Sequence, residues 1–163
     1  MTCILGIDPG SRATGYGLIA QSETSIRYVA SGCIRTHSDD FPSRLKEIYE
    51  GIDLVVSEYD VDECAIEEVF VAHNPNSALK LGQARGAAMV AVLAHEISIS
   101  EYAARFVKNM VVGTGSATKD QVQYMVKMLL HLEGDISKDA SDALAIAICH
   151  VFSKRTNDWP TGR

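Results

Sequence analysis

The sequence lacks any uninterrupted apolar stretch of membrane length, although 47% of its 163 residues are hydrophobic. This combination argues against a membrane protein and favours a soluble globular domain with a proper core. The first apolar run has neither a basic segment before it nor a cleavage site after it, so we interpret it as a strand and expect a cytoplasmic protein. Repeats, low-complexity blocks and linkers are also missing. We therefore predict a single domain over residues 1–153, followed by a short flexible tail at 154–163.

Cysteine is scarce, and no pair has the Cys-x-x-Cys spacing. The four cysteines lie in separate apolar segments, at Cys3, Cys33, Cys64 and Cys149. This pattern favours reduced, buried thiols over disulfides or a zinc site.

Basic residues are outnumbered, with 15 Lys and Arg against 21 Asp and Glu and a net charge of −6. On average, such a charge argues against a nucleic-acid partner. The distribution is uneven, however, because residues 38–68 carry eleven acids and two bases, whereas residues 69–119 carry five bases and two acids. The second segment is therefore suited to face a polyanion, with the bases Lys80, Arg85, Arg105, Lys108 and Lys119.

Turn residues and apolar spacing predict a mixed α/β fold. Strand-like segments occupy residues 3–8, 14–21 and 26–35, and the turns between them are so short that the strands must be antiparallel neighbours. Helices are expected at 42–58, 76–96, 119–132 and 139–152, with short strands at 64–69 and 97–102 and a Gly-rich loop at 111–118. A helix between two strands implies a parallel return. We therefore expect a five-stranded mixed sheet covered by helices on both faces.

Two glycine motifs resemble nucleotide-binding sequences but lack the required context. Residues 15–20 match the dinucleotide fingerprint, yet they continue as a strand where the fingerprint must turn into a helix. We assign these glycines to a strand that packs closely against a neighbour. Residues 113–119 lack the second glycine immediately before lysine that a P-loop needs.

Four acidic residues lie at the ends of segments that should be buried: Asp8, Glu67, Asp139 and Asp142. Each has a structural alternative, since Asp8 begins an Asp-Pro-Gly turn, Glu67 ends a strand, and the other two can cap a helix or meet its dipole. Buried carboxylates are nevertheless costly without a partner. Because Asp139 and Asp142 share a helical face and Gly6 leaves room beside Asp8, the set favours a site for hard divalent cations.

Two further residues have a functional and a structural interpretation. Lys119 lies in the first turn of a helix capped by Thr118 and Gln121, where the dipole disfavours a cation, so we expect either a phosphate contact or a solvated lysine. Phe70 is either part of the core or an aromatic that stacks on an exposed base. The spacing of Gly82 and Gly86 indicates close helix packing, inside the fold or across a dimer.

An ordered set of motifs closely resembles the bacterial RuvC family of Holliday junction resolvases, from about Cys3 to Phe152. The motifs are ILGIDPGS at 4–11, TGYG at 14–17, AIE at 65–67, NSALKLGQARG at 76–86 and DASDALA at 139–145. The resemblance implies a ribonuclease H-like fold, a homodimer, and Mg²⁺-dependent cleavage of four-way DNA junctions in recombination and repair. It also implies two metal ions per site, substitution by Mn²⁺, and the branch-migration partners RuvA and RuvB.

The resemblance also assigns roles to residues of this sequence. It identifies Asp8, Glu67, Asp139 and Asp142 as the metal-binding catalytic carboxylates, Lys108 and Lys119 as the functional lysines and Phe70 as the stacking aromatic. We add Lys80 and Arg85 as expected DNA contacts because they belong to the basic segment. The chain departs from the expected pattern at His73 and Pro75, in a loop that should be more basic and less rigid, and in the acidity of residues 38–68.

Two other functions remain open at this point. Actin-like sugar kinases and ATPases share the opening turn, but they need two such domains, and this chain is long enough for one. A junction-binding protein without catalysis would leave the four acids incidental. ATP turnover and metal-dependent nicking would separate these alternatives.

Overall fold

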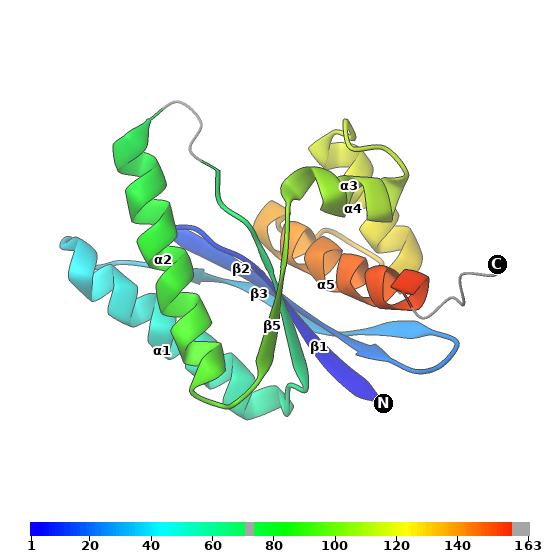
Figure 1. Ribbon diagram of the computed structural model, residues 1–163, viewed down its shortest axis with the longest axis horizontal. Coiled ribbons are helices and arrows are strands. Elements are labelled where there is room, and N and C mark those ends of the chain that lie inside the picture. Colours follow the sequence, from blue (N-terminus) through cyan, green and yellow to red (C-terminus); the bar gives the residue numbers. More distant parts are fainter. Residues whose placement is uncertain (71–73, 158–163) are drawn as a thin grey trace.

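The computed structural model describes residues 1–70 and 74–157. Five strands form one sheet in the order β3-β2-β1-β4-β5 (Figure 1). The strands β1 (Thr2–Asp8), β2 (Ala13–Gln21) and β3 (Ile26–Arg35) are antiparallel neighbours, as predicted from their short turns. The strands β4 (Glu63–Glu67) and β5 (Ser98–Tyr102) continue the sheet in parallel. The expected mixed sheet is confirmed.

Helices cover both faces of the sheet (Figure 1). On one face lie α1 (Phe41–Tyr59) and α2 (Pro75–Leu93), which share an apolar cluster with Leu5, Ile7 and Leu18. On the other lie α3 (Ala104–Val112), α4 (Lys119–Leu130) and α5 (Lys138–Asn157), which pack with Ile4 and Ile19. Successive side chains of a strand point to opposite faces. Asp8, four residues after Ile4, therefore belongs to the α5 face.

Glycines let α5 lie directly on the first two strands. A Cβ on Gly6 would collide with the main-chain oxygen of Ala143, and one on Gly15 would collide with that of Asp139. The prediction that the glycines of β2 pack closely is confirmed. The expectation that Gly6 leaves open space beside Asp8 is wrong, because the backbone of α5 fills that space.

The structure adds one helix to the prediction and shifts the ends of several elements; β4 ends at Glu67 instead of residue 69, and α4 ends at Leu130 instead of residue 132. Residues 104–112 form α3, which we missed because it is only nine residues long and Ala103 gives it no side-chain cap. The helix α2 ends at Leu93 instead of Glu96, which has a left-handed backbone with φ 59°. The helix α5 continues to Asn157, so residues 154–157 are helical and do not belong to a flexible tail.

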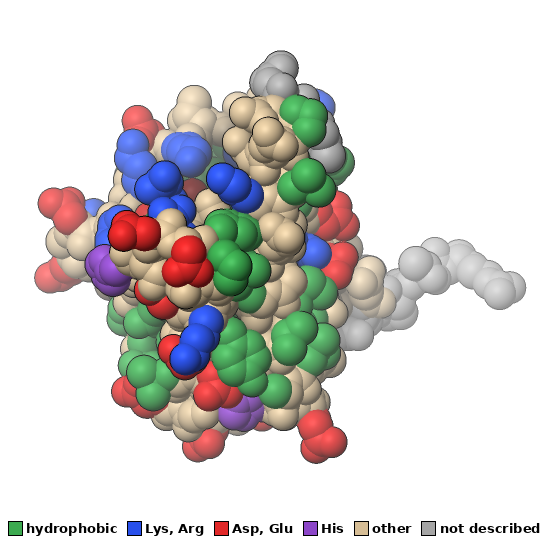
Figure 2. All heavy atoms as spheres, turned by 90° about the vertical axis from the view of Figure 1, so that its left-hand side faces the viewer, with side chains coloured by type: hydrophobic (Ala, Val, Ile, Leu, Met, Phe, Trp, Pro, Cys, Tyr) green, Lys and Arg blue, Asp and Glu red, His purple; other side chains and the backbone are tan. Residues whose placement is uncertain are grey.

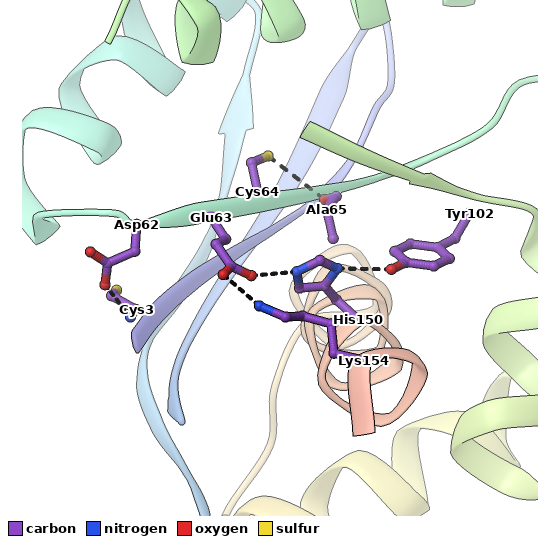
Figure 3. Close-up of polar contacts among 8 residues, drawn as sticks. All are labelled: Cys3, Asp62, Glu63, Cys64, Ala65, Tyr102, His150 and Lys154. Atoms are coloured by element: carbon purple, nitrogen blue, oxygen red, sulfur yellow. Dashed lines mark hydrogen bonds and ion pairs between the residues drawn. The ribbon is translucent and has the colours of Figure 1, made fainter. Parts of the chain in front are cut away.

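A polar network anchors the end of α5 to the sheet (Figure 3). Lys154 Nζ lies 2.6 Å from a carboxylate oxygen of Glu63, and His150 Nε2 lies 2.7 Å from the other. The Tyr102 hydroxyl is 2.8 Å from His150 Nδ1. Burial by itself raises the pKa of Glu63, but the hydrogen bonds from Lys154 and His150 outweigh it and lower that pKa.

All four cysteines are free, as predicted, although only Cys64 and Cys149 are fully buried. Across residues 1–70 and 74–157, no helix is both long and apolar enough to cross a membrane.

Candidate active site

Three of the four predicted acids line one cavity of about 250 Å³, together with both predicted lysines. Asp8 comes from β1, Glu67 from β4, Asp142 from α5, Lys108 from α3 and Lys119 from α4. The remaining wall is apolar and consists of Ala104, Val107, Val122, Ala145 and Ile146. Five elements that are distant in sequence therefore bring acids and bases to one opening.

The sheet and α5 together determine where the acids lie. The parallel ladder pairs Ile7 with Ile66, so the residues that follow, Asp8 and Glu67, end adjacent strands at the same edge of the sheet. Asp142 approaches them from α5, which can sit this close because Gly6 and Gly15 have no side chains.

Burial and nearby negative charges raise the pKa values of the three acids that line the cavity. The pKa of Asp8 is raised to about 8, first by burial and then by the charges of Glu67, Asp142 and Asp139. Burial and the charge of Asp142 raise the pKa of Glu67, and a hydrogen bond with Asp8 opposes the rise. Burial also raises the pKa of Asp142, against the lowering effect of Lys119. A cluster of this kind is destabilised unless protons or cations reduce its negative charge.

Asp139, the fourth predicted acid, does not line the cavity. Its Oδ2 lies 3.6 Å from the thiol of Cys33 on β3, although its charge still raises the pKa values of Asp8 and Asp142. Asp139 is also not the helix cap that we considered. The Ser137 hydroxyl accepts a hydrogen bond from the Ala140 amide at 3.2 Å and so caps α5.

The two lysines reach the cavity in different ways. Lys119 begins α4 behind the predicted capping box of Thr118 and Gln121, which is confirmed. Its Nζ lies 3.8 Å from Asp142 Oδ2, while 71% of its side chain is exposed. It therefore has both an acidic neighbour and access to an anion from solvent. Lys108 is half-buried in the cavity wall.

The other predicted DNA contacts lie outside the cavity. Phe70 is 69% exposed, which excludes the core interpretation. Lys80 is exposed on α2, and its Nζ lies 5.8 Å from the ring centre of Phe41. Arg85 is largely buried and donates from Nε to the main-chain oxygen of Glu67 at 2.9 Å. His73 falls outside the described residues, whereas Pro75 is the first residue of α2, where its fixed φ suits the helix start.

Two contacts of the site, Arg85 with Glu67 and Cys33 with Asp139, had no signal in the sequence. Arg85 was assigned to the basic segment by charge alone, and Cys33 was treated only as a small apolar residue. Each contact joins elements that are far apart in the chain, because Arg85 and Glu67 are separated by 18 positions in sequence and Cys33 and Asp139 by 106. Only the tertiary structure reveals such pairs.

The donor set fits Mg²⁺, which binds carboxylate oxygens and keeps several waters. Among residues 1–70 and 74–157, no group of three or more His, Cys, Asp or Glu side chains is arranged to hold an ion unaided. This does not conflict with the fit, because Mg²⁺ in phosphate-processing sites is typically held by one or two carboxylates and completed by substrate phosphate. Asp8, Glu67 and Asp142 are carboxylates at one opening and fit this requirement.

Comparisons with known proteins identify the family of this chain. The family model described as crossover junction endodeoxyribonuclease RuvC matches residues 4–150. A relative of that name from Serratia proteamaculans is 60% identical over 92% of this chain and 87% of its own, and one from Photobacterium profundum is 56% identical over 96% and 90%. The solved structure of Thermus thermophilus RuvC in complex with a Holliday junction substrate superimposes with a TM-score of 0.89 at 29% identity, over 96% of this chain and 97% of that one. The chain therefore belongs to the RuvC family of crossover junction endodeoxyribonucleases.

Proposed function

We propose that this Holliday junction resolvase hydrolyses phosphodiester bonds in the cavity formed by Asp8, Glu67 and Asp142, with Mg²⁺ as the cofactor. The observation that carries the proposal is the meeting of three carboxylates from three elements with two lysines at one opening. Family membership argues against the kinase and the purely binding alternatives, because the relatives are endodeoxyribonucleases. The products would be 5′-phosphate and 3′-hydroxyl ends.

Each residue has a separate role in this proposal. Asp8, Glu67 and Asp142 would hold the metal, and Asp139 would join them after turning away from Cys33. Bound Mg²⁺, expected as two ions per site, would help to activate a water and to stabilise the departing 3′ oxygen, and Mn²⁺ is expected to substitute. Lys119 would contact the scissile phosphate, whose negative charge grows in the transition state. Lys108 would supply a second positive charge from the cavity wall.

Phe70 and Lys80 would contact the DNA outside the cavity. The exposed ring of Phe70 follows Glu67 by three residues and is free to stack on a base opened at the crossover. Lys80 presents its ammonium group on the exposed side of α2, where it can meet a phosphate. These contacts would orient a junction arm relative to the acids.

We further propose that the working unit is a two-fold homodimer that uses the outer side of α2. Hydrophobic side chains reach the surface over this face of the molecule (Figure 2). On α2, Leu79, Val90 and Leu93 are each more than half exposed, and a Cβ on Gly82 or Gly86 would meet nothing within 4 Å. Within the described residues these glycines thus have no packing partner, which leaves a second copy of the chain as the partner. Two symmetric sites would make the paired cuts that resolve a crossover.

Two parts of the proposal rest on family membership and chemistry more than on geometry. We expect RuvA and RuvB to deliver the junction, as implied by the family resemblance. We place the protein in the cytoplasm because its substrate is DNA and its four cysteines are free thiols.

Single isosteric substitutions of the acids test the proposal. Asp8→Asn, Glu67→Gln, Asp139→Asn and Asp142→Asn should each abolish Mg²⁺-dependent cleavage of a synthetic mobile junction. Junction binding in EDTA should survive, because removing negative charge cannot weaken attraction to DNA. Glu50→Gln, an exposed acid on α1, is the matched control and should cleave normally. Normal cleavage by Asp8→Asn would contradict the proposed site.

A further inference from the structure

Arg85 is the one base of the predicted DNA-binding set whose side chain is largely buried, with 16% exposed. It extends from α2 beneath the end of β4, where its Nε donates to the main-chain oxygen of Glu67 at 2.9 Å. Its Nη2 lies 3.3 Å from a carboxylate oxygen of Glu101, and its Nη1 lies 3.3 Å from the Met89 sulfur. The guanidinium is therefore occupied within the fold.

The Glu67 carbonyl that accepts from Arg85 lies just beyond the point where β1 and β4 stop pairing. The ladder between β1 and β4 ends at the pair Ile7 and Ile66, so β1 does not pair with Glu67. Among the strands that the structure describes, only β5 pairs with Glu67, through Tyr102. The orientation of the Glu67 carbonyl defines the ψ angle of that residue, and ψ helps to aim the side chain. A charged donor on this carbonyl thus restrains the backbone from which the Glu67 carboxylate projects.

The environment strengthens this contact. Hydrogen bonds from a charged donor are shorter and stronger than neutral ones, and the guanidinium is a rigid, planar donor. One Arg85 terminal nitrogen is buried without a hydrogen bond, so its pairing with Glu101 is ionic only. Arg85 therefore donates its Nε hydrogen bond to the Glu67 carbonyl, and Glu101 balances its charge.

We infer that Arg85 is a positioning residue that aims Glu67 toward the metal, in place of the DNA contact expected from its charge. The inference rests on the proposed role of Glu67 as a metal ligand. Groups that orient a metal ligand typically change metal affinity or activity by about 10–100-fold when they are removed. A DNA contact has a different signature, because losing one phosphate contact weakens junction affinity and lowers the slope of log affinity against log salt by about one.

The decisive experiment measures metal and DNA binding separately in Arg85→Gln and Arg85→Lys. Mn²⁺ binding to the free protein is titrated well below each variant's melting temperature, and junction affinity is measured in EDTA over a salt series. Both variants should bind Mn²⁺ about 10-fold or more weakly, with unchanged junction affinity and salt slope. Lys80→Gln, an exposed base on the same helix, should show the opposite pattern.

Two more variants separate the explanations. Glu101→Gln leaves the bond from Arg85 to Glu67 in place, so its Mn²⁺ affinity should stay close to wild type. Glu67→Gln should lose as much Mn²⁺ affinity as Arg85→Gln, and the double variant should lose little more.

Several results would overturn the inference. A lower salt slope in Arg85→Gln with normal Mn²⁺ affinity would make Arg85 a DNA contact. An equal loss in Glu101→Gln would assign the effect to local packing. Weak Mn²⁺ binding in Glu67→Gln but not in Arg85→Gln would refute the inference while leaving the proposed function intact, and normal binding in both would refute the two together.

Discussion

Replacing Asp8 with Asn should stabilise the metal-free protein, because Asp8 is the acid most strongly disfavoured by its surroundings. The carboxyl has a pKa of 3.8 in a model peptide and about 8 in the folded protein. An acid whose pKa is raised by folding opposes folding once the pH exceeds the unfolded value, and its penalty grows until the pH reaches the folded value. The penalty of Asp8 is thus absent below about pH 4 and increases up to about pH 8.

The magnitude at pH 7 follows from the same difference. The pH lies about three units above the unfolded pKa, and each unit corresponds to about 1.4 kcal/mol, which gives an upper limit of about 4 kcal/mol. The hydrogen bond between Asp8 and Glu67 offsets part of this penalty. We therefore expect Asp8→Asn to raise the free energy of unfolding by about 1–3 kcal/mol. For a chain of this size, each 1 kcal/mol corresponds to about 2–4 °C in melting temperature.

Thermal unfolding in EDTA across pH 4.5 to about 8 tests this prediction. Asp8→Asn should melt above wild type at neutral pH, and the difference should shrink towards acid pH. Saturating Mg²⁺ should raise the melting temperature of wild type by mass action and that of Asp8→Asn much less. Asp135→Asn, an exposed acid in the loop before α5, should show neither effect. A stability gain that does not change with pH, or no gain at all, would refute the reasoning.

Three further predictions concern single contacts. Lys119→Ala should lower the single-turnover cleavage rate by about 10 to 10³-fold at saturating protein with only a modest loss of junction affinity, and a wild-type rate would make Lys119 a surface charge. Phe70→Ala should impair junction cleavage while Phe70→Trp retains it, and neither should change the melting temperature, because the ring is 69% exposed. Glu63→Gln should destabilise the protein at neutral pH, since an acid with a lowered pKa stabilises the fold above its unfolded value. That stability difference should fade as the pH drops below about 4.5, which unfolding at several pH values would show.

The regular parts of the fold could be predicted because their signals are local. The turns after Asp8 and Gln21 are short enough to require antiparallel neighbours, and the capping box at Thr118 marks the start of α4 without tertiary information. The helix α3 could not be predicted in this way. It has no side-chain cap, and only Val107 and Val111 form its buried stripe, so its stability comes from packing against other helices.

Three of the four predicted acids do line one cavity, but the geometry of the candidate site was not predictable. Carboxylates at the ends of buried elements point to a shared site, yet no sequence pattern reveals that Asp139 faces Cys33 while Asp142 faces the cavity. The two acids are only three residues apart on α5, yet they have different neighbours because Asp139 lies beside β3 and Asp142 lies beside the cavity. Likewise, charge alone cannot show that Arg85 turns inward while Lys80 stays exposed.

The glycines of the first two strands explain why acids from distant elements can meet. Gly6 and Gly15 are tolerable in strands only because α5 replaces the side chains they lack, with its backbone at Ala143 and Asp139. This contact brings the acidic first turns of α5 to the edge where Asp8 and Glu67 end their strands. The same closeness desolvates the acids and raises the pKa of Asp8 to about 8. The packing that assembles the site therefore also concentrates buried negative charge, which a divalent cation would neutralise.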